Sequence, residues 1–167
     1  MIYVTVGSSI GGAGFERLIM KIDEIAPGLG KDILMQIGSS QYVPKNTRWL
    51  RYASYEESLD YFKNAELVIG HCGSGTIINA LSFATKLILV PRRQAYLELP
   101  DEHQLEIARF VEKNGFATLV YDLDDLEKVT RVALASGGAE RRGFVSPSKK
   151  ELLKNLQDYV SYLSKRQ

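Results

Sequence analysis

The stretch GHCGSGT, residues 70–76, combines three glycines, a serine, a threonine and one of the two histidines of the chain. An apolar run ends just before it and a helical pattern begins within it, which predicts a turn between a strand and a helix. Glycines let backbone N–H groups approach an anion, and a helix that begins at Gly75 or Thr76 directs its amides and positive dipole end into the turn. The pattern favours a phosphate or diphosphate site. A tight turn without a ligand remains the alternative, because glycine-rich turns are common in α/β proteins.

Three further polar segments follow predicted strands: GSSIGGAG at 7–14, GSSQ at 38–41 and PRRQAYLELPDEHQ at 91–104. Ligands of open parallel sheets bind outside the carboxyl ends of the strands, so these segments and the 70–76 turn together favour a nucleotide site. The chain contains neither G-x-G-x-x-G nor the P-loop pattern, so neither a dinucleotide fingerprint nor a P-loop NTPase is supported.

Other reactive residue types favour structural roles. DLDD at 122–125 favours a helix cap over a metal motif, because Asp is a preferred N-cap. Cys72 beside His71 favours a packed, unreactive thiol, since catalytic partners usually meet through the fold. Arg92 and Arg93, at a strand end, are either solvated surface charges or groups that stabilise a departing diphosphate. The histidines and acids show no metal-ligand spacing, so no metal is expected.

Short apolar strands and amphipathic helices alternate along the whole chain, which predicts an α/β Rossmann-like three-layer sandwich with a mainly parallel sheet. The first helix is expected to stop at Pro27. We expect one domain over residues 1–167, ending in an amphipathic helix at 148–167. The expected strands lie at 2–7, 31–38, 48–53, 66–70, 86–91 and 116–121, and the other helices at 54–65, 75–85, 101–115 and 124–136.

The composition is that of an ordinary globular domain of 167 residues, with 45% hydrophobic and 25% charged residues. A net charge of +1 argues against general nucleic-acid binding. No stretch approaches the roughly 20 apolar residues that span a bilayer, and the first residues lack a secretory pattern, so a cytoplasmic location is expected. The single cysteine excludes an internal disulfide.

The segments ELVIGH, CGSGT, IINALS, KLILVPRR and DEHQLEIARFVEKNG together resemble the C-terminal, donor-binding half of GT-B glycosyltransferases of the MurG-like family. They are also similar to split enzymes in which this half is a separate polypeptide. Examples are the catalytic subunit of the bipartite UDP-N-acetylglucosamine transferase and polysaccharide-biosynthesis subunits of the PssE and EpsF type. The resemblance covers most of residues 1–120.

The resemblance implies the donor half of a two-subunit, inverting, UDP-sugar-dependent hexosyltransferase that needs no metal. The sugar could be N-acetylglucosamine, galactose, glucose or glucuronic acid. A membrane-anchored partner subunit would bind a lipid-linked acceptor, supply the general base and hold this chain at the membrane.

The resemblance also assigns roles to residues of the site. Those implied for the diphosphate are Gly7, Ser8, Ser9, Gly73, Ser74, Gly75 and Thr76, those for ribose and uracil are Asn79, Tyr52 and Tyr55, and those for the sugar are His103 and Gln104. Arg92 and Arg93 are candidates for stabilising the leaving group. His71 either contacts the ligand or caps and packs the turn.

Asn79 departs from the family pattern, which usually places Glu there to hold the ribose hydroxyls. A carboxylate accepts hydrogen bonds at two oxygens, whereas an amide accepts at one. The change predicts weaker binding of uridine nucleotides or a different donor. It also leaves open a non-catalytic enhancer subunit that stabilises a separate transferase.

The last predicted helix, at 148–167, carries an apolar stripe at helical spacing. This stripe either packs on the core of the domain or docks on the partner, and nearby basic residues could face lipid headgroups. The stripe comprises Leu152, Leu153, Leu156, Tyr159, Val160 and Leu163.

Overall fold

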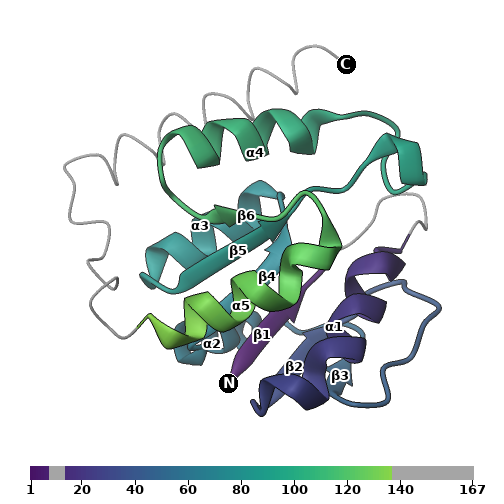
Figure 1. The fold of residues 1–167 in the computed structure, drawn as a ribbon, viewed down its shortest axis with the longest axis vertical. Helices are drawn as coiled ribbons and strands as arrows, with labels where there is room; N and C mark the ends of the chain where they lie inside the picture. Colours follow the sequence, from purple (N-terminus) through teal and green to yellow (C-terminus); the bar gives the residue numbers. More distant parts are fainter. Residues whose placement is uncertain (8–13, 137–167) are drawn as a thin grey trace.

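Six strands and five α-helices lie along residues 1–7 and 14–136, the part of the chain that the computed structural model describes, and they alternate except that β3 follows β2 directly (Figure 1). The predicted helix at 148–167 lies outside these residues. The strands are β1 (Ile2–Thr5), β2 (Ile33–Gln36), β3 (Arg48–Leu50), β4 (Leu67–His71), β5 (Lys86–Val90) and β6 (Thr118–Leu119). The helices are α1 (Glu16–Leu29), α2 (Tyr55–Asn64), α3 (Ser74–Ser82), α4 (His103–Lys113) and α5 (Leu126–Ala135), with short 3₁₀ turns η1 (Gln94–Tyr96) and η2 (Leu123–Asp125).

All strand pairings are parallel, and the order across the sheet is β3-β2-β1-β4-β5-β6. The chain runs outward from β1 to β3, then returns to the other side of β1 and runs outward again to β6. The direction reverses between β1 and β4, so the connections that leave these two strands diverge to opposite faces of the sheet. This divergence opens a crevice at their carboxyl ends, which is the usual ligand position in such sheets.

Helices cover both faces of the sheet, as predicted. Alternate residues of β1 enter two separate cores, because successive side chains of a strand point to opposite faces. Val4 lies in the core beneath α1 and α5, together with Ile19 and Leu126. Tyr3 lies in the core beneath α2, α3 and α4, together with Ile77. The three-layer Rossmann-like fold is therefore confirmed. Within the described residues, no helix is long and apolar enough to span a membrane.

The prediction that Pro27 ends the first helix is wrong, because α1 continues through it to Leu29. Proline has no N–H, so the carbonyl of Asp23, four residues earlier, loses its helical partner. The side chain of Asn46 replaces it, with Nδ2 donating to that carbonyl at 2.9 Å. The helix ends instead at Leu29, because its C-cap Gly30 has a φ of 59°, the left-handed conformation that glycine adopts readily.

The Asp23 carboxylate fastens the loop after β2 onto α1. It is almost fully buried and accepts from the Tyr42 hydroxyl at 2.7 Å, from the Lys45 backbone at 2.9 Å and from the Asn46 backbone at 2.8 Å. Burial alone would raise the pKa of Asp23, but these hydrogen bonds outweigh it and the pKa lies below its usual value.

Substitution of Asn46 by Ala should lower the free energy of unfolding by about 1–2 kcal/mol, because the Asp23 carbonyl would lose its donor. The cost should shrink in a Pro27→Ala background, where residue 27 regains an N–H for that carbonyl. Urea unfolding of the two single variants and the double variant measures this coupling. Asn64→Ala is the matched control, since Asn64 Nδ2 donates to an exposed helix carbonyl of Asp60 at 2.9 Å. Equal costs of Asn46→Ala in both backgrounds would contradict this account of the continued helix.

Candidate functional site

The crevice between β1 and β4 brings Gly7 against the 70–76 turn. The His71 imidazole fits between two glycines there: a Cβ on Gly7 would lie 2.6 Å from His71 Cε1, and one on Gly73 would also overlap the ring. Gly7 has a φ of 67° as well, which side chains disfavour. Both positions therefore require glycine for geometric reasons. The histidine, predicted either to contact ligand or to pack, does pack in this turn.

The His71 imidazole is neutral at physiological pH. Its enclosure lowers its pKa most, and the nearby positive charge of Arg92 lowers it further, to about 3. Thr76 Oγ1 lies 3.4 Å from His71 Nδ1, a long hydrogen bond that connects the ring to the first turn of α3. The ring can therefore order the turn through one nitrogen without adding charge to the crevice.

The N-terminus of α3 is open, in the sense that its first backbone amides lack a side-chain acceptor among the described residues. Gly73 is its N-cap in an extended conformation, and no side chain in the described part of the chain accepts from its first amides. The N-terminus of α2, in contrast, is closed by the capping box of Ser54 and Glu57 that the sequence predicts. A Cβ on Gly75 would meet no atom of residues 1–7 and 14–136 within 4 Å, so the described part of the chain leaves the space above this turn free. The helix begins at Ser74, one residue before the first predicted start.

Alanine at Gly73 should lower stability and alanine at Gly75 should not, although both glycines lie in one turn. Gly73→Ala should lower the free energy of unfolding by about 1–3 kcal/mol, because its methyl group overlaps the His71 ring. Gly75→Ala should leave it unchanged or raise it by up to about 1 kcal/mol, since Ala favours a helix and the space is open. Thermal unfolding of the two variants compares them directly. A similar loss for both would contradict the packing of His71.

The neutral state of His71 should make stability depend on pH. The unfolded histidine binds a proton below its ordinary pKa of about 6.5, whereas the folded one does so only near 3, so stability falls as the pH drops through this window. Between pH 7 and pH 5, the wild type should lose roughly 1–2 kcal/mol more than His71→Gln. Urea unfolding at both pH values tests this. Parallel losses in the two proteins would show that His71 titrates normally when folded.

Arg92 is buried, so its interpretation as a solvated surface charge is wrong. Its guanidinium donates to the Val6 carbonyl at 2.7 Å, beside Gly7, and lies 5.3 Å from the centre of the Phe15 ring. Burial lowers its pKa, and the carboxylate of Glu98 opposes that shift. Arginine stays protonated even so, which gives the end of β1 a fixed positive charge. Its Nε has no partner among the described residues.

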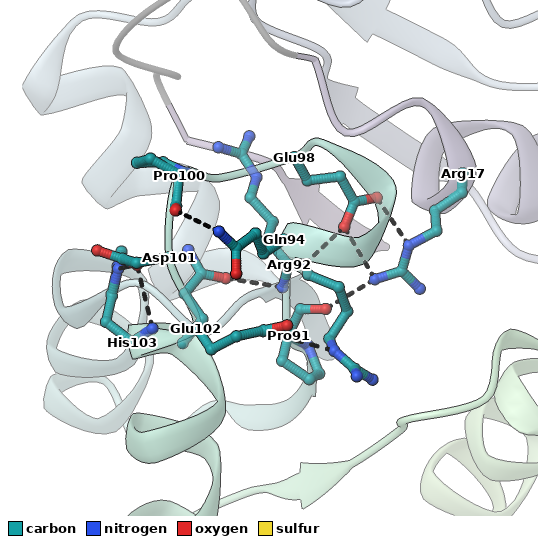
Figure 2. Close-up of polar contacts among 11 residues, drawn as sticks. Arg17, Pro91, Arg92, Gln94, Glu98, Pro100, Asp101, Glu102 and His103 are labelled. Carbon is teal, nitrogen blue, oxygen red and sulfur yellow. Dashed lines mark hydrogen bonds and ion pairs between the residues drawn. The ribbon is translucent and has the colours of Figure 1, made fainter.

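Gln104 and His103 begin α4, and both are held by neighbours; Figure 2 shows His103 beside Asp101. Gln104 is buried, and its Oε1 accepts from the Arg92 backbone at 2.9 Å. The imidazole of His103 pairs through Nδ1 with the Asp101 carboxylate, which also accepts from the His103 backbone at 3.1 Å. Arg93, half-buried, lies 3.6 Å from Glu102. The predicted sugar contacts of Gln104 and His103 stay predictions.

The remaining predicted residues lie around the same edge of the sheet. Asn79 is half-buried in α3, and Tyr52 and Tyr55 are exposed near the start of α2, which packs beside α3. Ser8 and Ser9 lie outside the described residues. Cys72 is fully buried, and burial raises the pKa of its thiol, which confirms an unreactive cysteine.

The acidic segment 122–125 caps a helical turn. The Asp122 side chain accepts from the Asp124 backbone at 3.0 Å at the start of η2, which confirms the capping role of this segment. No three His, Cys, Asp or Glu side chains gather at a metal-binding distance within residues 1–7 and 14–136.

Sequence reasoning missed Arg17 and Glu98, which meet at the rim of the crevice (Figure 2). Arg17 Nε donates to Glu98 Oε1 at 2.7 Å, and Glu98 is almost fully buried. The two residues are 81 positions apart, so no local pattern marks the pair.

Comparison with known proteins identifies the family of the domain that carries this site. The family described as "Glycosyltransferase family 28 C-terminal domain" matches residues 1–140. The chain belongs to this family. The resemblance to the donor-binding half of GT-B glycosyltransferases is thereby confirmed.

Two curated relatives of this family 28 domain bear informative names. The mouse "UDP-N-acetylglucosamine transferase subunit ALG13" is 28% identical over 124 residues, covering 68% of this chain and 10% of the relative. The "UDP-N-acetylglucosamine--N-acetylmuramyl-(pentapeptide) pyrophosphoryl-undecaprenol N-acetylglucosamine transferase" of Leptospira interrogans serogroup Icterohaemorrhagiae serovar copenhageni is 33% identical over 75 residues, covering 44% of this chain and 20% of the relative. The matches thus span only a tenth to a fifth of the length of these relatives.

Among solved structures, the family 28 domain resembles the NMR structure of ALG13, with a TM-score of 0.59 and 18% identity over 93% of this chain and 94% of that one. At this identity the likeness shows a shared fold. In chemical terms, the site presents open helix amides, a neutral histidine and a buried arginine. This combination suits a ligand with concentrated negative charge.

Proposed function

We propose that this chain is the donor-binding half of an inverting glycosyltransferase that takes its sugar from a UDP-sugar. The observation that carries the proposal is the open N-terminus of α3, at the reversal between β1 and β4, in a family 28 glycosyltransferase domain. The diphosphate would lie over Gly75, where it meets the first amides of the helix. N-acetylglucosamine is the first sugar to test, because both curated relatives carry it in their names. Galactose, glucose and glucuronic acid are the alternatives.

In the proposed reaction, an acceptor hydroxyl displaces the diphosphate at the anomeric carbon. The leaving diphosphate oxygen gains negative charge, and the amides of α3, already in position, stabilise that charge. Removal of one such donor typically lowers kcat by about 10²–10³. Arg92 contributes through its fixed charge at the end of β1, because its guanidinium is held by Val6. These groups supply the positive potential that a metal would otherwise provide, so the proposed reaction requires none.

The acceptor side belongs to a partner in this proposal. The mouse relative is named as a subunit, which favours a two-component enzyme. We propose a membrane-anchored partner that binds a lipid-linked acceptor, supplies the general base and keeps this chain at the cytoplasmic face of the membrane. Residues 148–167 are the candidate docking element.

A second candidate function is a non-catalytic enhancer subunit that stabilises a separate transferase. Asn79 favours it, because the amide offers one acceptor oxygen to a ribose where a carboxylate offers two. The two functions differ in one measurable respect, since an enhancer would not transfer sugar even when its partner and acceptor are present.

Calorimetric titration with UDP should show binding to the full chain. Gly75→Ala should weaken that binding at least about fivefold, because its methyl group would occupy the space proposed for the diphosphate and hold it away from the helix amides; one lost charge-assisted hydrogen bond costs about 1.5–3 kcal/mol. Its fold should remain intact, because the methyl group enters open space. Gly28→Ala, in the last turn of α1, is the control, because Gly28 has no positive φ and the atom nearest to its added methyl group is the end of the flexible Arg131 side chain. An absence of binding at millimolar UDP would refute the donor site. Binding without transfer in the presence of partner and lipid acceptor would favour the enhancer.

A further inference from the structure

An ion pair fastens α1 to the loop between β5 and α4, at the rim of the proposed donor site. Arg17 meets Glu98 with two hydrogen bonds, from Nε at 2.7 Å and from a terminal nitrogen at 3.1 Å. The same terminal nitrogen donates to the Pro91 carbonyl at 2.7 Å. Arg17 thus holds both ends of the segment 91–98 at once (Figure 2). Two parallel bonds fix orientation as well as distance.

The segment held by this pair contains a strained turn. Leu97 has a φ of 57°, which a side chain disfavours by roughly 1–2 kcal/mol. Its amide donates to the Gln94 carbonyl at 2.8 Å, and the Glu98 carboxylate accepts from the Arg93 amide at 2.8 Å. The Tyr96 ring stacks 4.7 Å from the Arg17 guanidinium. Strain of this kind persists only where the surrounding contacts impose the conformation.

The same segment connects two residues with predicted roles to the rest of the crevice. It contains Arg92, whose backbone amide donates to Gln104. It leads into α4, which begins with His103 and Gln104, the predicted sugar contacts. Most predicted uridine and diphosphate contacts lie outside the segment: Tyr52 and Tyr55 at and just before α2, and Gly73 to Asn79 in the 70–76 turn and α3. Arg92 belongs to the segment, but its guanidinium is held separately by the Val6 carbonyl. Movement of residues 93–98 should therefore displace the sugar end of the site more than the nucleotide end.

We propose that Arg17 and Glu98 are positioning residues that set where α4 presents its first residues to the sugar of the donor. The proposal rests on the proposed function. A buried ion pair is a poor source of stability, because removing two charges from water costs about as much as their attraction returns. Glu98 is 6% exposed and Arg17 21%. The ion pair therefore contributes mainly by fixing the position of the segment 91–98, and little to the stability of the fold.

The chain offers a matched control pair. Arg48 meets Asp32 with the same two-bond arrangement, at 2.9 and 2.6 Å, but 62% and 55% of their side chains are exposed. These residues lie at the starts of β3 and β2, at the edge of the sheet opposite the crevice. Breaking this pair should leave both ends of the donor site unchanged.

The experiment compares calorimetric affinities for UDP and for a UDP-sugar in Glu98→Gln, Arg17→Lys and the controls Asp32→Asn and Arg48→Lys. The sugar nucleotide is the one that the wild type binds most tightly among those carrying N-acetylglucosamine, galactose, glucose and glucuronic acid. We expect Glu98→Gln and Arg17→Lys each to lower UDP-sugar affinity by about fivefold or more, while UDP affinity changes less than twofold. The controls should change neither affinity. Arg17→Lys retains the charge and provides the test should Glu98→Gln not fold.

The pattern of UDP and UDP-sugar affinities decides whether Arg17 and Glu98 position the sugar end of the site. Selective loss of UDP-sugar affinity supports the positioning role. Equal loss for both ligands, as a purely structural contact would give, overturns it, and so does unchanged affinity for both. A wild type that binds neither UDP nor a UDP-sugar refutes the proposed function instead, and the positioning role with it.

Discussion

The close fit of the His71 imidazole between Gly7 and Gly73 is the constraint on which the crevice depends. Gly7 follows β1, and His71 and Gly73 lie at and just after the end of β4, more than 60 positions later in the chain, so the ring fills the gap where the connections from these neighbouring strands diverge. Once the ring occupies this gap, the N-cap of α3 must remain glycine and extended. The first amides of α3 are then left without a side-chain acceptor, because the residue best placed to cap them has no side chain. A packing requirement and an anion-binding geometry thus follow from the same contact.

The charged residues form a frame around this contact. Arg92 and Arg17 both stack on Phe15, at 5.3 and 5.1 Å, and between them they reach carbonyl groups at the ends of β1 and β5. The only acid that contacts Arg17 among the described residues is Glu98. Positive charge is therefore held rigidly at the carboxyl edge of the sheet, where mobile side chains would lose much of their electrostatic effect to reorganisation.

Local patterns were enough to predict the fold and the 70–76 turn. Alternating apolar strands and amphipathic helices specify a parallel sheet, and glycine with Ser and Thr specifies a turn at its edge. Prediction failed where a distant residue supplied the missing interaction. Asn46 lets α1 pass Pro27, and Val6, 86 positions away, accepts from a buried Arg92. The ion pair of Arg17 and Glu98 was missed for the same reason. No spacing rule in one sequence connects residues that only the completed sheet brings together.

The reversal of strand order has a consequence for folding. The contacts across the crevice join residues far apart in the chain, such as Gly7 with His71 and Val6 with Arg92, so loop-closure entropy opposes them until β4 has joined β1 and β5 has joined β4. The strands on either side of the reversal can each assemble with local neighbours first. The crevice is consequently among the last features to form. Under the proposed function, nucleotide affinity would therefore report on the fully folded domain, because a partly folded chain can possess most of its helices and strands without this crevice.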